Sequence, residues 1–107
     1  MTIEEAQVID IISTAKDGRS VTITATDHLE WGGKEHLMKI QEKLNSYLAF
    51  IESGEIFESY PDSKGKQINI NIICKYPPDA EGIKFLNLCK GSVENAGFQF
   101  CYKVNEI

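Results

Sequence analysis

The sequence has no run of 18 apolar residues and no CxxC pair, and it contains an odd number of cysteines, three. A membrane-spanning helix needs about 20 apolar residues, so we expect none. Cys74, Cys89 and Cys101 cannot all pair within the chain, which favours reduced thiols, no disulfide and a cytoplasmic location. Residues 1–5 are acidic and have neither the basic region nor the apolar core of a signal peptide.

Basic residues are also scarce, because 11 Lys and Arg stand against 16 Asp and Glu, for a net charge of -5. Neutralising phosphates takes clustered Lys and Arg, so we expect neither nucleic acid nor a membrane surface as a partner. An acidic balance suits a basic partner better. The length of 107 residues, with 42% apolar and 25% charged residues, predicts a single globular domain over residues 1–107.

The clearest periodic segment runs from Glu35 to Gly54 and predicts the main helix. Its apolar residues recur at helical spacing and form one stripe. Gly54 can adopt a left-handed conformation and so end the helix. Phe50 and Met38 fall outside the stripe, which makes them candidates for an interface.

Alternating polar and apolar residues predict five strands, over residues 8–13, 21–26, 55–60, 67–76 and 98–104. Lys16 to Arg19 offers a turn between the first two strands, and Asp79 is a good N-cap for a second helix. The expected fold is an α+β two-layer sandwich of order ββαββαβ, with one mainly antiparallel five-stranded sheet and two helices on one face. The expected core contains Leu37, Ile40, Leu44, Leu48, Ile51, Ile70, Ile72, Leu86, Phe98 and Phe100.

The loop between the second strand and the main helix concentrates polar groups around the only Trp. Its candidate binding residues are Asp27, His28, Glu30, Trp31 and Glu35. Trp31 either anchors a partner or pins the loop onto the core. His28 beside Asp27 or Glu30 is the one arrangement that suits acid–base chemistry.

No metal site is expected in this loop. Glu35 and His36 are adjacent, so their side chains diverge by about 100° on a helix, and the HExxH spacing is absent. We expect His36 to lie in a solvated first helical turn. No G-x-S-x-G motif signals a nucleophile, so we assign no catalytic residue and no cofactor.

Several short motifs together resemble a family of small uncharacterised bacterial proteins, known only as a domain of unknown function. The motifs are D-H-L-x-W at 27–31, E-H-L at 35–37, L-N-x-Y-L-x-F-I-x-S-G-E at 44–55, Y-P at 60–61, K-Y-P-P at 75–78 and A-G-F at 96–98. The resemblance implies a bacterial protein and carries no established activity.

Two functions are therefore open. The first is a non-catalytic protein-binding module, accessory or immunity-like. Its partner is either another protein, with a basic protein favoured, or another copy of itself. The alternative is a small enzyme or ligand-binding protein that uses His28 with Asp27 or Glu30. A pocket lined by His28 and a carboxylate would favour the alternative.

Overall fold

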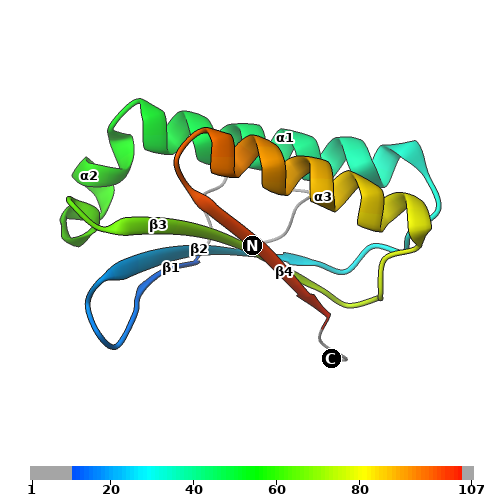
Figure 1. Cartoon of the computed structure of the whole chain (residues 1–107), viewed down its shortest axis with the longest axis horizontal. Coiled ribbons are helices and arrows are strands. Elements are labelled where there is room, and N and C mark those ends of the chain that lie inside the picture. Colours follow the sequence, from blue (N-terminus) through cyan, green and yellow to red (C-terminus); the bar gives the residue numbers. More distant parts are fainter. Residues whose placement is uncertain (1–10, 105–107) are drawn as a thin grey trace.

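The computed structural model describes residues 11–104. Four strands and the helical segments follow one another in the order β1 (Ile11–Thr14), β2 (Ser20–Asp27), α1 (Lys34–Glu52), α2 (Glu55–Ser59), the 3-10 helix η1 (Pro61–Ser63), β3 (Gln67–Cys74), α3 (Ala80–Asn95) and β4 (Gln99–Val104). Helices α1 and α3 lie side by side over one face of the sheet, so the molecule has two layers (Figure 1). The predicted α+β class and the placement of the two main helices are confirmed.

The sheet has the order β1-β2-β3-β4 and is mixed. β1 pairs with β2 antiparallel, whereas β2 with β3 and β3 with β4 are parallel. Parallel neighbours need a crossover connection, which α1 and α3 supply. Since successive crossovers share one hand and the strands are added in one direction, both helices reach the same face.

The first hairpin forms where the turn residues predict it. The amide of Ala15 donates to the carbonyl of Ser20 at 2.9 Å, and Gly18 adopts a φ of 71°. That conformation is costly for residues with a Cβ, so the glycine sets the turn. The part of the predicted first strand before residue 11 lies outside the described residues.

The predicted strand over residues 55–60 is wrong, and so is the second hairpin built on it. Gly54, with a φ of 83°, ends α1 as expected, but the chain then enters α2. Ile56 and Phe57 are adjacent apolar residues, which a strand would send to opposite faces. In the short helix both turn inward, since Ile56 is buried and Phe57 packs against the core.

The fold therefore departs from the expected order ββαββαβ. The described residues contain four strands instead of five, and most strand pairing is parallel. Between β2 and β3 the chain forms α1, α2 and η1. It thereby returns to the edge of the sheet at which β2 begins, and β3 starts there, parallel to β2.

The core lies between the sheet and α1 with α3. Along β2 and β3 every second residue is buried, and the intervening Thr and Asn side chains occupy the other face. Of the ten predicted core residues, Leu37, Leu48 and Phe98 are only half-buried and the other seven are buried. Phe50 is buried as well, so its predicted place outside the apolar stripe is wrong. No helix within residues 11–104 is long and apolar enough to cross a membrane.

Two leucines of α3 test this arrangement. Leu86 is fully buried, whereas Leu88 is 67% exposed. In dilute solution Leu86→Ala should lower the free energy of unfolding by about 2–5 kcal/mol, because it leaves a cavity in the core. Leu88→Ala should change it by less than about 0.5 kcal/mol. Denaturant titrations give both values, and equal effects would mean that α3 is rotated relative to the sheet.

Candidate functional site

The predicted site loop starts at the carboxyl edge of the sheet. β2 ends at Asp27 and β3 ends at Cys74, and these two residues are partners in the parallel register. From this edge one connection leads to α1 and the next leads to α3. Ligands of open parallel sheets bind outside this edge at a point where the strand order reverses, and the order β1-β2-β3-β4 of the described strands contains no such reversal.

Asp27 is a buried carboxylate with a full set of partners. It is 1% exposed. Its Oδ1 accepts from the amide of Leu29 at 3.1 Å, and its Oδ2 lies 2.6 Å from Nε2 of His36. Its backbone carbonyl accepts from the amide of Lys75 at 2.8 Å. One residue thus fastens the end of β2, the loop, the start of α1 and the segment after β3.

His36 is not in a solvated turn, and that prediction is wrong. It is 5% exposed and lies one turn before Ile40 on the buried face of α1. Its Nδ1 is 3.1 Å from the carbonyl of Glu30, which can only accept, so Nδ1 donates. The other ring nitrogen is held by Asp27. Both ring nitrogens of His36 are therefore engaged by groups of the protein itself.

Trp31 holds the two loops together. Its ring centroid lies 4.2 Å from that of His36, with 39° between the planes. Its Nε1 donates to the carbonyl of Tyr76 at 3.0 Å. A Cβ on Gly82 of α3 would lie 2.6 Å from Cε3 of Trp31, so only glycine leaves room for the indole at that position.

The predicted N-cap of α3 is confirmed at the same place. Oδ1 of Asp79 accepts from the amide of Gly82 at 2.8 Å. This hydrogen bond fixes the first turn of α3, and Gly82, whose amide it holds, is the residue that faces the indole. The interpretation that Trp31 pins the loop is consistent with all of these contacts.

The other candidate residues are on the surface. His28, Glu30 and Glu35 are exposed, and the predicted divergence of Glu35 from its neighbour His36 is observed. The structure therefore brings Asp27 and Trp31 together with His36, which was not among the candidates.

A hollow of about 310 Å³ does lie beside His28. It is lined by Thr26, Asp27, His28, Ile73 and Lys75. The side chain of Asp27 is 0% exposed and its Oδ2 faces His36, so the carboxylate is not available in this hollow. The predicted pairing of His28 with Asp27 thus has its carboxylate already engaged elsewhere.

Cys74 is buried, Cys89 is half-buried and Cys101 is exposed. Burial, together with the negative charge of Asp27, raises the pKa of Cys74 to about 12. Burial alone raises the pKa of Cys89 to about 11. Both thiols are therefore protonated at neutral pH and are poor nucleophiles. Cys101 is exposed, and its Sγ contacts Oδ1 of Asn71 at 3.3 Å.

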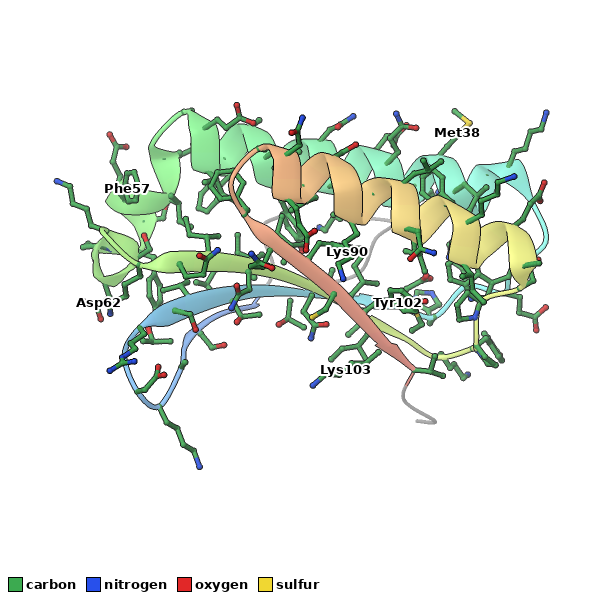
Figure 2. The ribbon with its side chains drawn as sticks, in the orientation of Figure 1. Met38, Phe57, Asp62, Lys90, Tyr102 and Lys103 are labelled. Carbon is green, nitrogen blue, oxygen red and sulfur yellow. The ribbon has the colours of Figure 1, made fainter. Side chains whose placement is uncertain are left out.

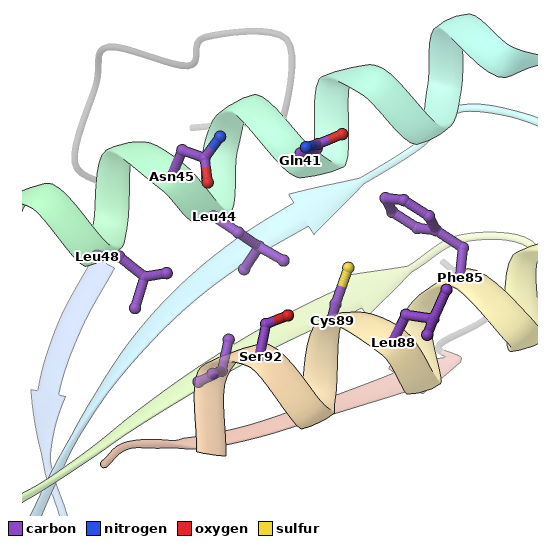
Figure 3. Close-up of a pocket in the computed structure, with 9 residues that line it drawn as sticks. Gln41, Leu44, Asn45, Leu48, Phe85, Leu88, Cys89 and Ser92 are labelled. Carbon is purple, nitrogen blue, oxygen red and sulfur yellow. The ribbon is translucent and has the colours of Figure 1, made fainter. Parts of the chain in front are cut away.

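A second candidate surface is a groove between α1 and α3, called here the helical groove (Figure 3). It encloses about 230 Å³ on the side of the helices away from the sheet. Its lining residues are Gln41, Leu44, Asn45 and Leu48 of α1, and Phe85, Leu88, Cys89, Ser92 and Val93 of α3. The sequence pattern does not single out this groove. Met38 is 58% exposed, which agrees with its predicted place outside the apolar stripe.

The fold and the site define a small two-layer α+β protein with a mixed sheet and a buried carboxylate–histidine pair at its carboxyl edge. The chain belongs to a family of unknown function, DUF6572, whose model matches residues 1–106. The predicted resemblance to an uncharacterised family is confirmed. No curated protein matches the chain. No solved structure matches it either.

Substitution of the two histidines separates the buried pair from the exposed residue. His36→Ala should lower the free energy of unfolding by about 3–5 kcal/mol, because Asp27 would stay buried without its main partner. His28→Ala should cost less than about 1 kcal/mol, since that side chain is exposed. Thermal and denaturant melts measure both. A larger loss of stability for His28→Ala than for His36→Ala would mean that His28, and not His36, stabilises the loop.

Two glycines of α3 test the contact with Trp31. Apart from the helix's own backbone, nothing in the described part of the chain lies within 4 Å of where a Cβ on Gly91 would sit, whereas Gly82 faces the indole. Gly91→Ala should raise stability by about 1 kcal/mol through helix propensity. Gly82→Ala should lower stability and shift the Trp31 emission to the red, because the ring must move toward water. If both variants gain stability, Trp31 is not packed against α3.

Proposed function

We propose that this protein is a non-catalytic protein-binding module, and that an apolar side chain of its partner enters the helical groove. The observation that carries the proposal is the exposure of Leu88, which is 67% exposed at the wall of an apolar groove. A single exposed Leu is common, but contiguous apolar surface rimmed by polar residues marks interaction sites, and Leu88 adjoins the apolar walls of the groove.

The lining of the groove supports an apolar occupant. Leu44, Leu48, Phe85 and Val93 supply apolar walls, and none of the nine lining residues carries a charge. Burying such a surface costs little desolvation. The side chains of Gln41, Asn45 and Ser92 can hydrogen-bond to the backbone of a bound segment.

Met38 extends this surface along α1. It lies three residues before Gln41, and so on the same side of the helix. Its side chain points away from the sheet (Figure 2). A thioether adapts its shape to different apolar neighbours, which suits a contact residue at the end of the groove.

The size of the groove favours a protein over a small molecule. Sites for drug-sized ligands enclose about 300–1,000 Å³, and the helical groove encloses about 230 Å³. That space accommodates one or two side chains. A protein partner can fill it and gain the remainder of its contact area on the helices beside it.

The alternative, an enzyme that uses His28, has less support. The hollow beside His28 is present, but the Asp27 carboxylate is buried and bound to His36. Glu30, the other proposed partner of His28, offers its backbone carbonyl to His36 and its side chain is exposed.

Trp31 as a partner anchor and a basic partner both stay predictions. Trp31 is half-buried, so part of its ring is available to a partner. Residues 11–104 carry twelve acidic and eleven basic side chains, and the remaining acidic residues belong to the two terminal segments. The described residues are therefore nearly balanced in charge and do not favour a basic partner. The uncharged helical groove is the stronger candidate for the binding surface.

A matched pair of variants on α3 tests the groove. Leu88→Lys places a charge at its wall, whereas Ile83→Lys places one at a residue that is 43% exposed and does not line the groove. Proteins captured from a lysate by the wild type should be lost with Leu88→Lys, by about 2 kcal/mol or more in affinity, and retained with Ile83→Lys. Equal capture by both variants would exclude the groove.

A further inference from the structure

We infer that the occupant of the helical groove is a second copy of this chain, with the α1–α3 layers packed face to face about a two-fold axis. This inference rests on the proposed function, since it names the partner of the same groove. Three properties of the helical layer carry it: its shape, its charge and its area.

The shape is self-complementary. A two-fold contact uses the same patch on both molecules, so that patch must contain both a projection and a hollow. Leu88 projects, with 67% of its surface exposed, and the groove beside it is the hollow. Leu88 of each copy can therefore enter the groove of the other, with Met38 as a further projection on α1.

The charge of the layer is nearly balanced. Lys43 is buried, so the α1 residues that are not buried include three acidic and two basic ones, and those of α3 include two of each, for a net charge of -1. Like charges placed opposite each other oppose self-association, and a net charge of -1 repels a second copy only weakly. A basic partner would find little net attraction here. An identical face meets the same near balance of charges.

The size of the face is of the right order. With the layers stacked vertically in Figure 1, the molecule measures 38 Å by 23 Å across the direction of stacking. The rectangle with these sides is roughly 900 Å², and a standard stable interface buries about 800 Å² of accessible surface on each partner. The whole face, including its mixed-charge margins, would be used, with the groove and Leu88 at its apolar centre.

The test is the mass of the full chain in solution, measured by light scattering and sedimentation from about 1 to about 100 μM. The wild type should reach twice the mass of one chain. Leu88→Lys should raise the dissociation constant by about 30-fold or more. Asn45→Lys, on the opposite wall of the groove, should do the same, and Ile83→Lys should behave as the wild type. Far-UV circular dichroism confirms that each variant is folded.

Added salt gives a second readout. Because the layer has a net charge of only -1, and salt screens the weak repulsion between two copies, association should be unchanged or strengthened between about 0.05 and 0.5 M salt. A dimer that salt dissociates would be held by charge and not by the groove, which would overturn the inference.

The remaining outcomes separate this inference from the proposed function. A wild type that stays monomeric, with lysate capture that still depends on Leu88, overturns the second copy and leaves the binding module. A monomer whose capture ignores Leu88 overturns both. A dimer unaffected by Leu88→Lys and by Asn45→Lys uses another surface, and it overturns the inference.

Discussion

The hydrogen bond between Asp27 and His36 is the constraint on which the carboxyl edge of the structure depends. A carboxyl group removed from water needs hydrogen-bond partners, and each oxygen of Asp27 has one: the amide of Leu29 at 3.1 Å and Nε2 of His36 at 2.6 Å. The pair fixes where α1 begins relative to the end of β2. The imidazole then offers a face to Trp31, whose nitrogen holds the segment after β3 through Tyr76. The position of α3 follows, because its first turn lies against that indole at Gly82.

Much of the fold was predictable, because long periodic segments leave few alternatives. α1 and β3 show unbroken periods of 3.6 and 2, so most of their buried positions were assigned correctly. Residues 55–60 have too few positions to distinguish the two periods, and their conformation depends on Ile56 reaching the core after Gly54 has turned the chain. Local sequence patterns do not determine whether neighbouring strands run parallel or antiparallel. A strand with one solvent-facing side is typical of an antiparallel sheet. Here both main helices cover the same face of the sheet, so the parallel strands show the same alternation of buried and less buried residues.

The candidate site was only half predictable for a related reason. The loop was located from its composition, but the partner of Asp27 lies nine residues away, across the loop. His36 could have been found by extending the helix period to polar residues, since it shares the buried face of α1 with Ile40, Lys43 and Tyr47. A search for an apolar stripe passes over such positions. Lys43 shows the same effect, because it is fully buried with its Nζ 5.3 Å from the centre of the Tyr47 ring.

The hydrogen-bonded carboxyl edge and the helical groove proposed for recognition are separate parts of the molecule. At the carboxyl edge both side-chain oxygens of Asp27 and both ring nitrogens of His36 are already bonded, so a ligand there would have to displace contacts that hold α1 and α3 in place. Within residues 11–104 the side chains that line the helical groove show no comparable hydrogen bonds that a partner would have to break. Leu44 belongs to the core, Phe85 packs against it, and both line the groove. Because the edge sets the positions of α1 and α3, it also sets the width of the groove between them. In the proposed binding module, the buried pair would contribute to recognition through the spacing of two helices, without touching the partner.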